Sequence, residues 1–209
     1  MKLFDYSLAP NCRRVRMFLA EKGVSIPMEN VDLRSRDQLN EAYRAVNPRC
    51  DVPFLILDDG TGIGEVDAVC RYMEALYPDP PLYGASREDQ AVVTMWNHRM
   101  FMEGLVPGME ALRNSHKFFE DRALVGPKNY VQIPELAARG RQRLTDFFDF
   151  LDSQLADRPF IAGEIFSIAD ITAIVAVDFA GRVEMGPGEG HTALKRWHGA
   201  VSARPSAQA

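Results

Sequence analysis

The first 23 residues restrict the fold of this chain more than any other segment. Residues 1–7 have the pattern of a short apolar strand, and residues 11–23 have the spacing of an amphipathic helix that ends at Gly23. Only the turn Ser7-Leu-Ala-Pro-Asn-Cys12 separates them. A strand that passes so directly into a helix aims the first N–H groups of the helix, and one polar side chain, at a single point.

Strands and helices continue to alternate as far as residue 76. The apolar spacing predicts strands over 28–33, 53–57 and 62–64 and helices over 37–46 and 66–76. A strand-helix-strand unit followed by two strands and a helix is the order of a thioredoxin-like domain. The sequence therefore predicts an α/β N-terminal domain over residues 1–77.

The second half of the chain has no convincing strand pattern. The proline-rich segment Tyr77-Pro-Asp-Pro-Pro-Leu82 predicts a linker over residues 78–84. An all-α domain is then expected over 85–209. Its predicted helices span 86–114, 134–155, 167–181 and 191–202. Ser167-Ile-Ala-Asp170 has the pattern of a capping box, which we interpret as structural.

Composition excludes several classes of function. The formal net charge of −5 and pI of about 5.4 disfavour a nucleic-acid-binding protein. No run of eighteen apolar residues predicts a membrane span. Neither the three cysteines nor the four histidines have the spacing of metal ligands, so we predict no metal site. The chain opens directly into a strand, and a cytoplasmic location is the expectation.

Three motifs together resemble the glutathione transferase family: the turn that contains Asn11, the dipeptide Val52-Pro53, and Glu65 before a helix. The turn is similar to that of bacterial and fungal classes that carry asparagine there. The resemblance covers most of the chain and is weakest across 84–165. It implies glutathione as co-substrate, a small electrophile as acceptor, a role in detoxification, and a homodimer. The implied dimer interface includes Phe54 and the helices at 66–76 and 86–114.

The resemblance makes Asn11 the first candidate for the catalytic residue. The glutathione thiol, with a pKa near that of cysteine at about 8.5, must become a thiolate to be a good nucleophile. The Asn11 amide can donate a hydrogen bond to sulfur beside a helix N-terminus, although Asn is also a common helix cap. Ser7 is the second candidate and Tyr6 the third. Ala9 stands where several classes carry a catalytic hydroxyl.

Glutathione itself would be held by residues that match the family motifs. The resemblance implies a cis bond at Val52-Pro53, with the backbone of Val52 facing the cysteinyl part of glutathione. It implies that Glu65 pairs with the ligand ammonium. Val66 replaces the usual serine, so only helix N–H groups remain for the γ-glutamyl carboxylate.

A second departure precedes Pro53. Asp51 occupies the place where many relatives have a lysine near the glycyl carboxylate of glutathione. Arg49, Arg34 or Arg36 would have to supply that positive charge. The two departures, Val66 and Asp51, also favour an alternative in which the chain is a non-catalytic binding or interaction protein with this fold.

The acceptor site is expected in the groove between the domains. Met100, Phe101 and Gly104 on the helix at 86–114 are the predicted lining, with Glu103, Pro107, Phe118 and Phe119 nearby. Methionine and aromatic residues at helical spacing are, however, more often plain core than binding-site lining.

A second reaction is compatible with the same residues: glutathione-dependent reduction of a disulfide, with the glutathione thiol as nucleophile. Exchange through protein cysteines is not expected, because Ala9 replaces the first cysteine of the redox motif and only Cys12 remains.

Overall fold

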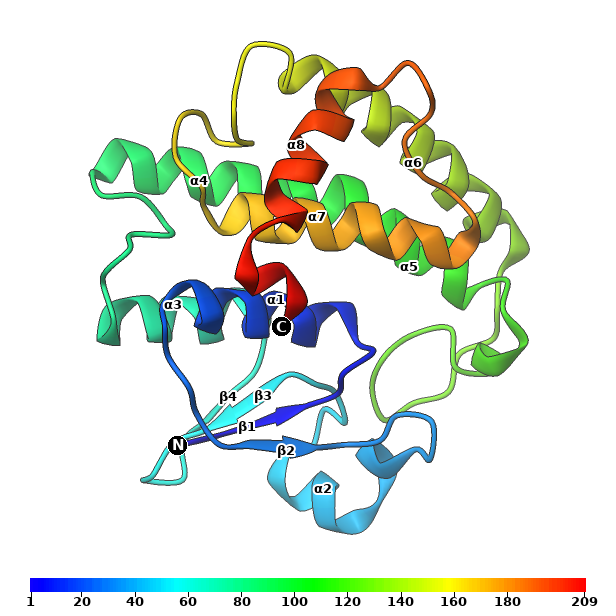
Figure 1. Cartoon of the computed structure of the whole chain (residues 1–209). Coiled ribbons are helices and arrows are strands. Elements are labelled where there is room, and N and C mark those ends of the chain that lie inside the picture. Colours follow the sequence, from blue (N-terminus) through cyan, green and yellow to red (C-terminus); the bar gives the residue numbers. More distant parts are fainter.

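A four-stranded mixed sheet forms the base of the N-terminal domain (Figure 1). The computed structural model describes all of residues 1–209. The sheet has the order β2-β1-β3-β4, with β1 parallel to β2 and antiparallel to β3, and β3 antiparallel to β4. The strands are β1 (Lys2–Asp5), β2 (Met28–Asn30), β3 (Phe54–Ile56) and β4 (Gly62–Ile63).

Helices cover both faces of this sheet. On one face lie α1 (Pro10–Glu21) and α3 (Val66–Leu76), and on the other lies α2 (Glu41–Val46) (Figure 1). Side chains alternate accordingly along β1: Leu3 enters the core below α1, whereas the ring of Phe4 packs edge-on against Tyr43 of α2. The expected order of strands and helices is confirmed.

Both ends of α1 follow from its sequence. Pro10 occupies the first turn, where its missing N–H costs nothing and its fixed φ suits the helix. Gly23 follows the last turn with φ +66°, a backbone conformation that glycine adopts without a steric penalty. Asn11 is therefore the second residue of α1, and the start of the helix fixes the position of its side chain.

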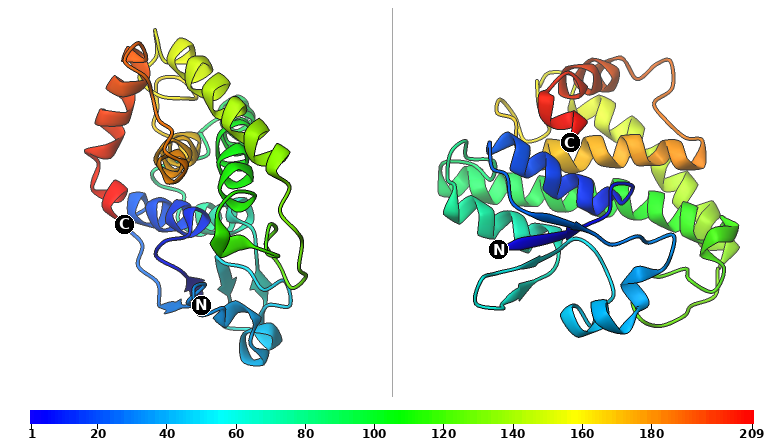
Figure 2. Two further views of the ribbon diagram at one scale, coloured as in Figure 1. Left: turned by 90° about the vertical axis from the view of Figure 1, so that its right-hand side faces the viewer. Right: turned by 60° about the horizontal axis from the view of Figure 1, so that its bottom comes forward.

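The C-terminal domain contains only helices, as predicted (Figure 2). The expected helix over 86–114 is present but carries a π-helical segment at Met100–Leu105 in its middle. No helix of residues 1–209 combines the length and the apolar character that crossing a bilayer would require. The principal helices are α4 (Arg87–Arg99), α5 (Val106–Arg113), α6 (Pro134–Gln154), α7 (Ile168–Ala180) and α8 (Thr192–Ser202).

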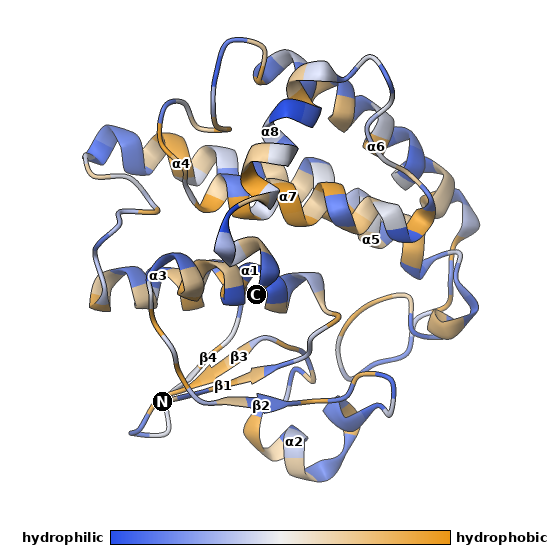
Figure 3. Cartoon of the chain, viewed as in Figure 1, coloured by the Kyte–Doolittle hydropathy of each residue, from blue (hydrophilic) through white to orange (hydrophobic).

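Helix α7 is the centre of the molecule and is the most apolar helix in Figure 3. Eleven of its 13 residues are buried. It packs against α1 of the N-terminal domain and α4 of its own domain, so a single hydrophobic core runs through both domains. The capping box is confirmed: the Asp170 carboxylate accepts from the Ser167 N–H at 3.0 Å.

The C-terminal segment returns to the N-terminal domain. After α8 the chain forms a short 3-10 turn at Pro205–Gln208 that lies beside α1 (Figures 1 and 2). The guanidinium of Arg204 donates to both oxygens of Glu21, at 2.8 and 2.6 Å, and the Ser206 hydroxyl also donates to that carboxylate. The end of the chain is thereby fastened to the last turn of α1.

Candidate active site

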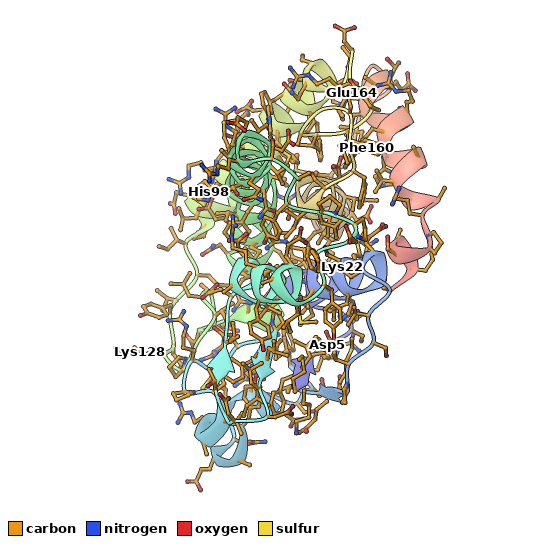
Figure 4. All side chains as sticks on the ribbon, turned by 90° about the vertical axis from the view of Figure 1, so that its left-hand side faces the viewer. Asp5, Lys22, His98, Lys128, Phe160 and Glu164 are labelled. Atoms are coloured by element: carbon orange, nitrogen blue, oxygen red, sulfur yellow. The ribbon has the colours of Figure 1, made fainter.

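A cavity of about 510 Å³ lies between the domains, at the N-terminal end of α1. One wall belongs to the N-terminal domain: the turn before α1, the loop after β2 and the residues around Val52. The other wall belongs to α5, the end of α7 and the segment 114–133 that joins α5 to α6. This segment lies beside the N-terminal domain (Figure 1). In Figure 4 its Lys128 lies level with Asp5 of β1, so the segment reaches the level of the sheet. The cavity is therefore built by both domains.

The side chain of Asn11 lies at the edge of this cavity with a defined orientation. Nη1 of Arg14, one helical turn further on, donates to Asn11 Oδ1 at 3.1 Å. The guanidinium has only donors, so the oxygen of the amide must face it. The Asn11 Nδ2 group then points away from Arg14 with its two N–H donors free. Asn11 can therefore donate a hydrogen bond to an anion at the N-terminus of α1.

Arg14 is itself held by a chain of buried hydrogen bonds. Its Nε donates to Thr172 Oγ1 on α7 at 3.0 Å, and that hydroxyl donates to Asn97 Oδ1 on α4 at 2.6 Å. Asn97 Nδ2 donates in turn to Asp67 Oδ1 on α3 at 3.1 Å. Burial lowers the pKa of Arg14, and Cys70, Tyr83 and Asp67 oppose that shift. Four helices thus fix one guanidinium, which fixes the amide of Asn11.

Sequence reasoning missed this network. Arg14 lies three residues after Asn11, which signals a contact along one helix face. Its partner Thr172 is 158 residues away. Nothing in the sequence around Thr172 indicates that its hydroxyl binds an arginine of the other domain.

A smaller cavity of about 280 Å³ lies on the other side of Asn11, at the start of α3. Glu65 lines it with an exposed side chain and φ +62°, and Val66 lines it from the first position of α3. The Val66 side chain is buried in the common core, so the first N–H groups of α3 remain as the donors. Asp67 is engaged by the Tyr83 hydroxyl at 2.8 Å and by Asn97. The cavity therefore offers one free carboxylate and one helix N-terminus.

The peptide bond between Val52 and Pro53 is cis, as the family resemblance implies, and Val52 lines the large cavity. Asp51 also lines it, but its carboxylate is engaged. Asn47 Nδ2 donates to Asp51 Oδ1 at 2.8 Å, and Arg49 Nε lies 3.4 Å from Asp51 Oδ2. Asp51 is thus partly neutralised by its own loop.

Of the three arginines considered for the glycyl carboxylate, two line the large cavity. Arg34 and Arg36 do so, and neither forms a salt bridge. Arg49 is exposed, pairs with Asp51 and lies outside both cavities. Arg34 and Arg36 are therefore the better placed cations on this wall.

Ser7 lies outside both cavities. It is exposed in the turn, and its carbonyl accepts from Arg16 Nη2 at 3.0 Å. Tyr6, the weaker candidate of the two by sequence, lines the large cavity. Both residues follow the last residue of β1, and of the two only Tyr6 lines a cavity.

The residues predicted to line the acceptor site are placed differently. Met100 is fully buried, and a Cβ added at Gly104 would overlap Cζ of the Phe147 ring, so both belong to the core. Phe101 lines the smaller cavity, with Arg14 5.3 Å from its ring centre. The wall of the large cavity is formed further along, by Met109 and Leu112 of α5, and by Phe118 and Phe119. The three predicted residues lie within the π-helical segment Met100–Leu105, and the residues that line the large cavity follow it in the chain.

Cys12 is a core residue. It is completely buried, and burial together with the nearby Asp5 raises the pKa of its thiol. A thiol held in its neutral form is a poor nucleophile, so the part that Cys12 plays is packing. No three His, Cys, Asp or Glu side chains in residues 1–209 come together in a way that could hold a metal ion.

The fold and this cavity define a glutathione S-transferase class of protein. The family model for the glutathione S-transferase N-terminal domain matches residues 3–81, and the model for the C-terminal domain matches residues 118–205. The chain therefore belongs to the glutathione S-transferase family.

Individual relatives are similar to this chain over nearly its whole length. Glutathione S-transferase 2 of Saccharomyces cerevisiae is 33% identical over 209 residues, covering 99% of this chain and 87% of that protein. A crystal structure of a glutathione S-transferase domain-containing protein from Marinobacter aquaeolei superposes with a TM-score of 0.91 at 31% identity, over 99% of each chain. The crystal structure of Gtt2 from S. cerevisiae gives a TM-score of 0.90 at 32% identity, covering 100% of this chain and 99% of that one.

Proposed function

We propose that this protein ionises the thiol of glutathione and transfers the resulting thiolate to an electrophile held in the cavity between the domains. The observation that carries the proposal is the orientation of Asn11, whose Nδ2 donors are left free because Arg14 engages Oδ1. A hydrogen-bond donor and a helix N-terminus both favour the anionic form of a sulfur placed beside them. A thiol pKa lowered by one corresponds to about 1.4 kcal/mol in favour of the thiolate.

The remaining parts of glutathione have matching partners along the same surface. The backbone of Val52 faces the cysteinyl part, the first N–H groups of α3 receive the γ-glutamyl carboxylate, and Glu65 pairs with the ammonium. Arg34 and Arg36 supply the charge for the glycyl carboxylate. The N–H groups of α3 take the place of the serine hydroxyl that Val66 lacks. Arg34 and Arg36 take the place of the lysine that Asp51 replaces.

The chemical step needs no covalent protein intermediate. The thiol proton leaves to solvent, and the sulfur forms a bond to the electrophilic carbon of the acceptor. When the acceptor is a halonitroarene, the carbon–halogen bond breaks and halide departs with the electron pair. A disulfide acceptor would instead give a mixed disulfide and a free thiol, so assays with both substrates separate the two reactions.

The direct test is Asn11→Asp. Aspartate has nearly the same shape, keeps an oxygen for Arg14 and remains a good helix cap, but it has no donor for sulfur when ionised. We expect the ultraviolet absorbance of bound thiolate to titrate at higher pH in this variant. Turnover at neutral pH should fall about tenfold if the thiol pKa rises by about one, and further if it rises more. Unchanged thiolate titration would refute the role of Asn11.

We also propose that the protein forms a homodimer through α3 and α4. Both helices carry exposed apolar side chains, which a protein–protein interface would cover. Those on or next to α3 are Leu76 and Tyr77, and those on α4 are Val92 and Met95. Phe54, which the resemblance also implied, is half-buried with its ring over Gly62.

A further inference from the structure

The large cavity has a strongly cationic lining. Five arginines face it, and Asp51 is the only carboxylate among its lining residues. That carboxylate already accepts from Asn47 and lies beside Arg49, so it does not balance the arginines opposite. The whole chain carries a net charge of −5, which makes this local excess of positive charge a property of the cavity and not of the protein surface in general.

Two of these arginines, Arg113 of α5 and Arg122 of the segment 114–133, lie on the helical-domain wall without any acidic partner. Arg113 donates to the carbonyl oxygens of Ala123 and Arg122, at 2.9 and 2.6 Å. Arg122 donates to the carbonyls of Lys128 and Gly126 and to the side-chain oxygen of Asn129. These oxygens engage only some of the N–H donors, since Nη1 of Arg113 and Nε of Arg122 are not among them, and they leave both charges uncompensated.

The two guanidinium groups also act on each other. Burial and the neighbouring charge of Arg122 lower the pKa of Arg113 to about 10, so Arg113 remains protonated at neutral pH. Two like charges held together in a half-buried site are unfavourable unless an anion joins them. Planar guanidinium groups are well suited to bind an oxyanion through paired hydrogen bonds.

An aromatic surface adjoins this pair. The guanidinium of Arg113 lies 4.5 Å from the ring centre of Phe119, and Phe118 meets Phe119 edge-on with ring centres 5.0 Å apart. Met109 and Leu112 of α5 complete an apolar wall beside the charges. This surface therefore combines affinity for a flat apolar ring with affinity for a negative charge.

These cations are additional to those that glutathione requires. In the function proposed above, the two carboxylates of glutathione are bound at the start of α3 and by Arg34 and Arg36, which all belong to the N-terminal domain. Arg113 and Arg122 belong to the opposite wall, where the acceptor lies.

We propose that the preferred acceptor is an aromatic electrophile that carries a carboxylate or similar oxyanion, which binds between Arg113 and Arg122 while its ring packs on Phe118 and Phe119. This substrate class rests on the proposed function for its chemistry. The binding of the anion, however, can be measured without turnover.

The experiment compares a chloronitrobenzoate with the matching chloronitrobenzamide, which has the same shape and reactive carbon but no charge. We expect kcat/KM to be higher for the benzoate in the unaltered enzyme. In Arg122→Gln, kcat/KM for the benzoate should fall about ten- to a hundredfold, the range for losing a hydrogen bond to a charged group. The benzamide value and the KM for glutathione should change little.

Two further variants separate charge from structure, because Arg122 also holds its loop. Arg122→Lys keeps the positive charge and should retain most of the preference for the benzoate. Arg141→Gln is a matched control: Arg141 also donates to a backbone carbonyl, that of Val183 at 2.6 Å, but lies outside both cavities. It should keep the preference in full.

Calorimetric titration with nitrobenzoate, which cannot react, distinguishes the two proposals. Binding that is lost in Arg122→Gln would support the anion site even if neither substrate were turned over, in which case the proposed function would fail alone. Equal kcat/KM for benzoate and benzamide would overturn the anion site while transferase activity stood. A raised KM for glutathione in Arg122→Gln, with the preference between the two substrates unchanged, would assign the arginines to glutathione and overturn the proposal.

Discussion

A single amide determines the chemistry proposed for this site, and an amide has two chemically opposite ends. The end that faces the ligand depends on which end is already engaged. Here Arg14 binds the oxygen of Asn11, and Thr172 and Asn97 hold Arg14 in turn. Arg14 therefore acts as a positioning residue, since the group that reaches sulfur is the asparagine.

Thr172→Val tests this chain of contacts from its middle. Valine has the shape of threonine without the hydroxyl, so it leaves Nε of Arg14 and Oδ1 of Asn97 without partners. We expect a loss of about 1–3 kcal/mol in the free energy of unfolding. We also expect a moderate fall in kcat with little change in the KM for glutathione. Denaturant titration and steady-state kinetics would measure the two effects, and a stability loss with wholly unchanged kcat would contradict the positioning role.

Gly104 provides a residue-scale test of packing. A Cβ at this position would overlap the Phe147 ring, so Gly104→Ala should destabilise the protein by about 1–3 kcal/mol. Gly199 of α8 has nothing within 4 Å of a Cβ placed in the same way. Gly199→Ala should therefore be neutral or stabilising by up to about 1 kcal/mol. Equal thermal midpoints for the two variants would refute the close packing described for Gly104.

Helix α7 begins at a buried polar side chain that joins three parts of the C-terminal domain. The fully buried Asp170 carboxylate accepts from Ser167 N–H, from Ile161 N–H at 2.9 Å and from Trp197 Nε1 at 2.9 Å. Burial raises its pKa to about 6, against these hydrogen bonds, which lower it. The carboxylate joins the start of α7 to α8 and to the loop before α7.

Asp170→Asn should destabilise the protein strongly, although asparagine and aspartate have nearly the same shape. Each carboxylate oxygen accepts two hydrogen bonds, and an amide can replace only one of the two oxygens. The amide NH₂ would face donors, and we expect a loss of about 3 kcal/mol or more. Ser167→Ala removes one cap and should cost about 1 kcal/mol. Chemical denaturation of both variants checks the ranking, and the reverse order would contradict it.

Secondary structure could be predicted from this sequence because its signals are local. Pro10, Gly23 and the capping box at Ser167 each act within a few residues, and the structure places a helix boundary at or next to every one of them. The cis bond at Val52-Pro53 followed from the family motif. The acceptor wall could be predicted only in part. Phe118 and Phe119 were expected near it and line the cavity, whereas Met109 and Leu112 lie beyond a π-helical segment at Met100–Leu105 that the hydrophobic spacing does not mark.

The network behind Asn11 could not be predicted for a different reason. Its members come from four helices, and each is an ordinary residue in its own segment. Arg14 resembles a solvated face of a basic helix, whereas it is 4% exposed and lies among groups brought together only by packing of the domains. Arg113 and Arg122 were missed likewise, since their pairing depends on the path of the segment between α5 and α6.

At the scale of the whole molecule, the C-terminal end of the chain joins the helical domain to the N-terminal domain. Arg204 and Ser206 bind Glu21 at the end of α1 opposite the active-site turn. Burial alone raises the pKa of Glu21, but the hydrogen bonds from Arg204 and Ser206 outweigh it, so the pKa lies below its ordinary value. A lowered pKa in the folded state means that this contact stabilises the protein above the unfolded pKa of about 4.3 and is lost as pH falls through the folded value.

Glu21→Gln should accordingly lower the thermal midpoint near neutral pH, by about 2–4 °C for each kcal/mol lost. The difference between the variant and the unaltered protein should shrink as pH falls below about 4, because protonated Glu21 then resembles glutamine. Thermal unfolding across a pH series would show this convergence. A constant difference at all pH values would mean that the charge of Glu21 does not contribute.

The proposed dimer makes a prediction at the same scale. Met95→Arg places a charge on the exposed apolar face of α4, where 42% of the Met95 residue surface is accessible in the single chain. We expect sedimentation to show a shift toward monomer, since a charge buried in an interface without a partner is strongly unfavourable. Leu124→Arg, on the equally apolar but distant segment 114–133, should leave the oligomeric state unchanged. A monomeric unaltered protein would refute the dimer.

Hydrogen bonds to backbone carbonyls hold the segment 114–133 in the cavity wall. Arg122 of this segment and Arg113 of α5 donate to its backbone carbonyls, and several of its apolar side chains, including Leu124, Val125 and Val131, are exposed. Substitutions at these exposed positions disturb neither the common core nor the amide that faces sulfur. Over evolutionary time this stretch can therefore diverge faster than the rest of the protein, giving relatives new acceptors while the machinery for glutathione is inherited intact.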